Sequence, residues 1–168
     1  MLSRFNRWLL TLCKWSAWFG MLLLLGAVFA TTVDILSRKL LGVTYQGTID
    51  LVQLCVLAAA FLSIPYAFIS RSHVAVAIFT DRLEGRWREA ISALSALLGC
   101  AIMAAFSWFG IGHAGMQIEY GDVSQTIGIP IAWYWAPVIY GTLLSSLVTL
   151  VMGVESLSRI IRGERRIS

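Results

Sequence analysis

His113 is the only His, Asp, Glu, Lys or Arg within the apolar run from Ala90 to Ile118 of this 168-residue sequence. An imidazole in such a run could hold a haem or a metal ion. The only other histidine, His73, falls on the opposite side of the membrane in the topology that the basic residues predict, and no cysteine or acid completes a ligand set. We therefore expect no cofactor and no metal, and we predict an interhelical hydrogen bond for His113.

The acids near the apolar runs stand at their ends. Asp34 and Arg38 are four residues apart in the favourable acid-then-base order, which predicts an interfacial ion pair. A transporter of ions or protons usually keeps an ionisable group at the centre of a helix, and no predicted helix has one. A transport site is therefore not expected. Charged residues at the outer ends are instead candidate contacts for a partner: Arg38, Lys39, Asp50, Glu119 and Asp122.

Signals of enzymatic chemistry are missing. The three cysteines, Cys13, Cys55 and Cys100, form no CxxC pair, and we find no Ser/His/Asp set, phosphate loop or paired carboxylates. A quinone-linked disulfide-forming enzyme with four helices would need cysteine pairs in its outer loops, and the predicted outer loops of this chain contain no cysteine. The net charge of +4 is spread over the ends and one loop, so nucleic-acid binding is not expected either. The chain is predicted not to be an enzyme.

The composition requires a membrane. Hydrophobic residues make up 58% and charged residues 13%, with a mean hydropathy of +0.78, whereas soluble domains carry nearer a quarter charged residues. About 20 apolar residues cross a hydrocarbon core of about 30 Å as a helix. The sequence predicts an all-α integral membrane protein with one membrane domain over residues 1–168. Its four transmembrane helices are expected at about 15–36, 48–69, 90–117 and 131–154.

The remaining segments are basic. Residues 1–14 are predicted to form a short amphipathic stretch suited to an anionic membrane surface, and residues 71–89 a cytoplasmic loop with an interfacial helical turn. A basic tail follows at 155–168. The first apolar run continues past Ala30 and is longer than a usual signal core, so we expect it to be retained as a helix rather than cleaved.

The distribution of Lys and Arg predicts the topology. Eleven of the 13 lie in the N-terminal stretch, the loop at 71–89 and the C-terminal tail, and only Arg38 and Lys39 lie in the other two connections. By the positive-inside rule both termini and the middle loop are cytoplasmic.

Small residues recur every four positions along two of the helices. Such stripes let helix backbones approach closely in lipid. Either they seal the chain's own bundle or they receive a partner membrane protein. The candidate packing residues are Ala96, Cys100 and Ala104 in the third helix and Gly141, Ser145, Thr149 and Gly153 in the fourth.

Several short motifs occur in a characteristic order. Arg38 and Gly42 follow the first helix, and Asp50 opens the second. His73-Val74-x-Val76 follows the second helix, and Ile129-Pro130 with Trp133 leads into the fourth. In these motifs, in size and in helix number, the chain resembles the small permease subunit (DctQ-like) of tripartite ATP-independent periplasmic (TRAP) transporters. It departs from the usual pattern in Thr48-Ile49-Asp50, where Trp-Glu is commoner, and in Ala77, where an acid is common.

The resemblance implies a function that depends on partners. These would be a large TRAP permease subunit that carries the substrate and sodium sites and moves as an elevator, a periplasmic substrate-binding protein that delivers an organic acid, and membrane lipid. The small subunit would pack on the fixed scaffold of the large one in the bacterial inner membrane. The rival interpretation is a self-sufficient four-helix homodimeric transporter, which needs an acid in the middle of the first helix; Asp34 lies too near its outer end.

Overall fold

Four long helices make up the computed structural model, which describes residues 2–43, 46–70 and 86–162. They are α1 (Leu2–Leu41), α2 (Thr48–Ile69), α4 (Arg86–Tyr120) and α5 (Ala132–Arg162). Each contains a segment long and apolar enough to cross a membrane. The predicted fold class, an all-α protein with four spanning helices, is confirmed over these residues. The predicted loop at 71–89 lies almost entirely outside them, as does its interfacial turn.

Three of the helices, α1, α4 and α5, are longer than the sequence predicts, and α4 extends past the expected 90–117 at both ends. Residues 2–14 are not a separate surface segment but the first turns of α1, and α5 continues to Arg162 into the predicted tail. No glycine or proline separates the basic stretch from the apolar run of α1, so nothing breaks the backbone hydrogen bonding there. With 40 residues, α1 is about 60 Å long at 1.5 Å per residue, about twice the thickness of a hydrocarbon core.

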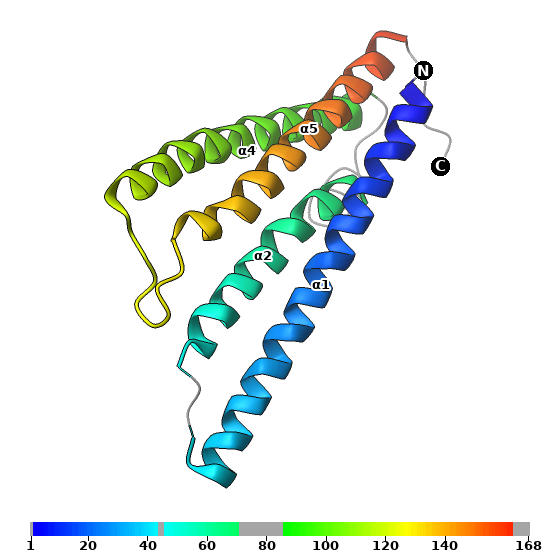
Figure 1. Ribbon diagram of the computed structural model, residues 1–168. Helices are drawn as coiled ribbons and strands as arrows, with labels where there is room; N and C mark the ends of the chain where they lie inside the picture. Colours follow the sequence, from blue (N-terminus) through cyan, green and yellow to red (C-terminus); the bar gives the residue numbers. More distant parts are fainter. Residues whose placement is uncertain (1, 44–45, 71–85, 163–168) are drawn as a thin grey trace.

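The helices pack in the order α1, α2, α5, α4 rather than as a closed ring. α1 packs against α2, α2 against α5, and α5 against α4. Figure 1 shows α1 and α4 on opposite sides of α2 and α5, with the helices converging near the N-terminus and spreading toward the other end. Both short connections, α1 to α2 and α4 to α5, lie at the spread end, as expected for alternating helix directions.

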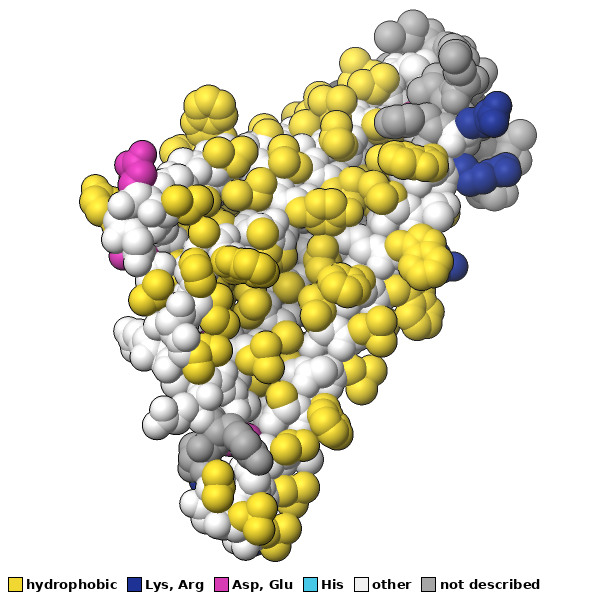
Figure 2. All heavy atoms as spheres, in the orientation of Figure 1, with side chains coloured by type: hydrophobic (Ala, Val, Ile, Leu, Met, Phe, Trp, Pro, Cys, Tyr) yellow, Lys and Arg dark blue, Asp and Glu magenta, His cyan; other side chains and the backbone are white. Residues whose placement is uncertain are grey.

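The core lies at the convergent end and is built mainly from α1 and α5. Leu9 and Cys13 of α1 meet Leu144 and Val148 of α5, with Phe68 of α2 packed beside them. α5 is central, and its buried face includes four side chains that are fully or almost fully buried: Thr142, Ser145, Val148 and Thr149. α4, by contrast, buries little beyond its contact with α5. Apolar side chains are consequently spread over the whole visible face of the molecule (Figure 2), as expected for a lipid-embedded chain.

Candidate functional site

Asp50, in the first turn of α2, is almost fully buried at 5% exposure. A buried carboxylate requires hydrogen-bond donors, and among the described residues they come from the loop between α4 and α5. Ser124 Oγ donates to Asp50 Oδ2 at 2.6 Å and Thr126 Oγ1 to Oδ1 at 3.1 Å. The backbone N–H groups of Thr126 and Ile127 donate to Oδ2 at 3.2 and 3.1 Å. We call Asp50, Ser124, Thr126 and Ile127 the Asp50 cluster.

The loop itself is folded so that its donors converge. Gly121 and Gly128 adopt positive φ of 67° and 69°, a region that favours glycine, and reverse the chain at either end. Across the loop, Ser124 N–H donates to the carbonyl of Ile129, which directly follows Gly128, at 2.8 Å. Ser124 Oγ also accepts the Ile129 N–H at 3.1 Å, so this hydroxyl both orders the loop and binds Asp50.

A close approach and a tyrosine complete the contact between α2 and this loop. Gly47, at φ 101°, precedes α2, and a Cβ there would lie 2.3 Å from Cγ2 of Ile127, so only glycine fits. Tyr134, in the first turn of α5, donates its hydroxyl to the Asp50 carbonyl at 3.0 Å. The start of α2, the loop and the start of α5 are thereby held as one unit at the spread end of the molecule.

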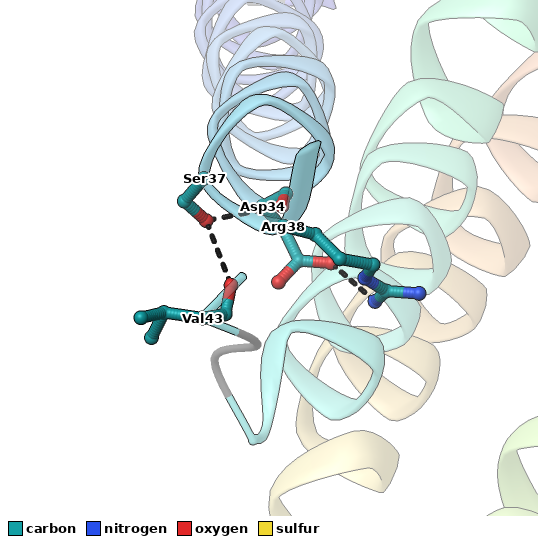
Figure 3. Close-up of polar contacts among 4 residues, drawn as sticks. All are labelled: Asp34, Ser37, Arg38 and Val43. Atoms are coloured by element: carbon teal, nitrogen blue, oxygen red, sulfur yellow. Dashed lines mark hydrogen bonds and ion pairs between the residues drawn. The ribbon is translucent and has the colours of Figure 1, made fainter. Parts of the chain in front are cut away.

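The Asp34–Arg38 pair predicted from the spacing is present near the end of α1 (Figure 3). Arg38 Nη2 lies 2.8 Å from Asp34 Oδ2, with the carboxylate nearly buried and the guanidinium 60% exposed. Ser37 Oγ donates to the Asp34 carbonyl at 3.0 Å, and its distance to the Val43 carbonyl is 3.4 Å. These contacts order the turn that leaves α1.

The other predicted outer-end charges are exposed and are not gathered into one site. Lys39 lies in the last turn of α1, Glu119 near the end of α4, and Asp122 just beyond it. The Asp122 carbonyl accepts the Ile131 N–H at 3.0 Å, so its backbone helps to close the α4–α5 loop. The structure thus places a buried acid within the loop contact and leaves the other charges exposed to water or a partner at the same end.

His113 differs from its prediction. Among the described residues it makes no interhelical hydrogen bond; its ring stacks on Trp135 of α5, with ring centroids 5.9 Å apart and an angle of 12° between the planes. The interhelical hydrogen bond at this level is made by Trp135, whose indole N–H donates to Gln117 Oε1 at 2.5 Å. Gln117 lies one turn beyond His113, so one indole contacts both side chains of α4. Within the described chain, no three His, Cys, Asp or Glu side chains come close enough to hold a metal.

The small-residue stripe of α5 lies inside the chain. A Cβ at Gly141 would lie 2.2 Å from the Phe61 carbonyl oxygen of α2. A Cβ at Gly153 would instead lie 3.6 Å from the Cβ of Ala96 on α4. Four residues turn a helix by about 400°, so each step of such a stripe rotates it by about 40°. Over its length the stripe therefore turns from α2 toward α4, which explains how α5 packs closely against both. Ser145 and Thr149, between the two glycines, are fully buried.

The same rotation carries the α4 stripe away from its neighbour. Ala96 and Cys100 are partly buried, but Ala104 is exposed. The buried positions of α4 instead follow a spacing near 3.5, through Ala93, Ser107, Gly110 and Ala114. Ser107 Oγ lies 3.0 Å from Thr142 Oγ1 of α5 in this contact. Ala104 is therefore not a packing residue within the chain.

Two features of the interior were missed from the sequence. One is a seven-residue spacing of buried residues on α1, at Cys13, Gly20, Ala27 and Asp34, with Ser16 buried between the first two, on the side of α1 that faces the other helices. Ser16 Oγ donates to the Leu62 carbonyl of α2 at 3.0 Å, and a Cβ at Gly20 would lie 3.0 Å from the Ala59 carbonyl oxygen. The heptad spacing signals this face; a search for four-residue spacing does not find it. The other is the set of loop donors to Asp50.

The family model for the DctQ component of tripartite ATP-independent periplasmic transporters matches residues 27–159. That range covers most of the chain and includes the Asp34–Arg38 pair, the Asp50 cluster and all of α2, α4 and the α4–α5 loop. The chain belongs to the DctQ family. Among individual curated proteins no match is found. As a DctQ component it is a small part of a TRAP transporter and a multi-pass membrane protein, which confirms the resemblance drawn from the sequence.

Proposed function

We propose that this DctQ protein is the small membrane subunit of a sodium-driven, binding-protein-dependent secondary transporter for organic acids in the bacterial inner membrane. It packs on the fixed scaffold of a large permease subunit and contains no transport site of its own. The family match over residues 27–159 carries this proposal, because it makes the chain one component of a multi-component transporter.

The polar groups of the spans support a role without transport. In the described parts of the helices, the charged side chains stand toward the ends of the spans. The buried polar residues farther in are mostly hydroxyls bonded within the chain, such as Ser16 to the Leu62 carbonyl and Ser107 to Thr142. A transported ion would need several oxygen ligands that converge in this region, whereas these two contacts lie apart, one between α1 and α2 and the other between α4 and α5.

The spread end supports a second contact, with the periplasmic binding protein. The Asp50 cluster fixes the α4–α5 loop on α2, and exposed charges stand at the ends of α1 and α4 toward the same end of the molecule: Arg38, Lys39, Glu119 and Asp122. A rigid loop loses little conformational freedom on binding, so it suits a docking surface better than a mobile one. We assign this end to the periplasm on the basis of the positive-inside rule.

Co-purification tests the proposal. The tagged chain, expressed with the large permease subunit from the same organism, should retain that subunit through affinity and size-exclusion steps. A matched four-helix membrane protein of another family, carrying the same tag, serves as the control. Recovery of this chain without the large subunit, in a detergent that keeps both soluble, would contradict the proposal.

A further inference from the structure

The first turns of α1 have two opposite faces. Leu9, Cys13 and Ser16 are buried against the rest of the chain. Arg4, Arg7 and Lys14 are exposed, and at about 100° per residue they lie within about 80° of one another, on the side away from the buried residues. The three cations therefore share a face that points away from α2 and α5.

Tryptophans share that exposed face. Trp8, Trp15 and Trp18 are 64%, 72% and 57% exposed and lie within the same angular sector as the cations or next to it. Tryptophan is enriched at the membrane–water interface because its apolar ring carries a polar N–H. Trp15 and Trp18 follow Lys14 closely, at the point where the long apolar run of α1 begins.

The face has no counter-charge of its own. The first acid in the sequence is Asp34, and none of the three cations forms an ion pair with another described residue. Among the described residues, Glu155 of α5 is an acid near this part of α1, and its carboxylate accepts a hydrogen bond from the Asn6 amide on the packed side. Within the part of the chain that the structure describes, the charge of the exposed face is therefore open to an external anion.

We propose that this face, Arg4, Arg7, Trp8, Lys14, Trp15 and Trp18, binds anionic phospholipid headgroups of the adjacent leaflet. Lys and Arg donate to the phosphates while the indole rings lie at the level of the headgroups. Because α1 is about twice as long as the hydrocarbon core is thick, its first turns must pass through or beyond the headgroup region. Such binding requires that α1 be inserted in the membrane, and it does not depend on the other components of the transporter.

Lipid titration of the purified full-length chain tests this. In neutral detergent, added phosphatidylglycerol should raise the melting temperature more than phosphatidylcholine does, and about 0.5 M salt should remove the difference, because it screens exposed charges. Arg7→Gln or Lys14→Gln should weaken the apparent affinity for phosphatidylglycerol about fivefold, and the triple Arg4/Arg7/Lys14→Gln variant about a hundredfold. Lys14→Arg keeps the charge and should bind as the wild type does.

Matched controls show whether the lipid response belongs to this face. Lys39→Gln removes an exposed cation at the other end of α1 and should leave the phosphatidylglycerol response unchanged. Inorganic phosphate should not replace the lipid. Equal responses to both lipids, an equal loss in Lys39→Gln, or full replacement by phosphate would each overturn the proposal. So would a triple variant that keeps its phosphatidylglycerol affinity but no longer co-purifies with the large permease subunit, since the face would then bind protein.

Discussion

At the scale of single residues, Asp50 is a buried acid whose side-chain partners, in the described part of the chain, come from one distant loop. Its position in the first turn of α2 suits a negative charge, because unpaired N–H groups point that way. Its two oxygens accept four hydrogen bonds from residues 124–127. The acid therefore acts as a positioning residue for the α4–α5 loop.

Removing the carboxylate should release this loop. In Asp50→Ala the loop donors, which are only partly buried, lose their acceptor, and a lost hydrogen bond typically costs about 0.5–1.5 kcal/mol. We expect hydrogen exchange at the Thr126 and Ile127 amides to rise at least tenfold, measured by mass spectrometry on the protein in detergent. Glu119→Gln, at an exposed acid at the same end, should leave these amides as protected as in the wild type. Unchanged protection in Asp50→Ala would show that the loop is held by other contacts.

The sequence predicts the charged residues at the ends of the helices but not what they bind. Asp34 and Arg38 are four residues apart on one helix, so helical geometry alone brings them together. The partners of Asp50 are more than 70 residues away, and their positions depend on the reversals at Gly121 and Gly128. A rule based on residue spacing within one helix therefore cannot predict which loop residues meet Asp50. For His113 the sequence predicts the helix, but whether a ring or a polar group faces the imidazole depends on how α5 is rotated.

At the scale of helices, contact between backbones is set by glycines at particular positions. Gly141→Ala places a methyl group against the Phe61 carbonyl, so α2 and α5 must separate. We expect a loss of about 1–3 kcal/mol, seen as a lower melting temperature of the purified chain. Gly112→Ala is the matched control, since a Cβ there meets nothing within 4 Å and alanine favours a helix by about 0.5–1 kcal/mol. A normal melting temperature for Gly141→Ala would contradict the close approach of α2 and α5.

The two stripes predicted from the sequence should respond differently to a bulky residue. Ser145 is fully buried within the chain, so Ser145→Leu should express poorly or melt early even without a partner, by about 1–3 kcal/mol. Ala104 is exposed, so Ala104→Leu should change stability by less than about 0.5 kcal/mol. If Ser145→Leu leaves the isolated chain sound and abolishes only co-purification with the large subunit, the α5 stripe is a partner surface.

Hydropathy identifies the four helices because spans of this length must satisfy their backbones internally. Hydropathy does not locate the ends of the helices, because α1 and α5 continue as helices beyond their apolar runs, through basic residues. A search for small residues four positions apart identifies the α5 stripe, because α5 has close neighbours, α2 and α4, on two sides. On α4, which packs on one neighbour, the same spacing rotates Ala104 outward.

At the scale of the whole molecule, the open row of helices leaves long faces of α1 and α4 uncovered. Trp18 and Phe29 of α1 and Trp108 and Phe109 of α4 are all more than half exposed. A small chain with so little closed interior is suited to contact with lipid or with a larger membrane subunit. This arrangement fits a component of an assembly better than a self-contained channel.

The orientation of this row is a further prediction. Reporter fusions at Thr44 and Asp122 should read as periplasmic, and fusions at Gly85 and Ser168 as cytoplasmic, because the basic residues concentrate on the latter side. Thr44, Gly85 and Ser168 lie outside the described residues. Alkaline phosphatase and green fluorescent protein fusions give complementary readouts. A cytoplasmic signal at Thr44 would reverse the assignment of the Asp50 cluster to the outer face.

Uptake into proteoliposomes tests the central claim most directly: the chain is a transport subunit that does not transport alone. With an inward sodium gradient and a panel of radiolabelled mono- and dicarboxylic acids, vesicles that contain only this chain should take up no more than empty vesicles. Uptake should appear when the large permease subunit and the periplasmic binding protein are added, and should disappear without sodium. Sodium-driven uptake by this chain alone would contradict that claim and support the homodimeric transporter instead.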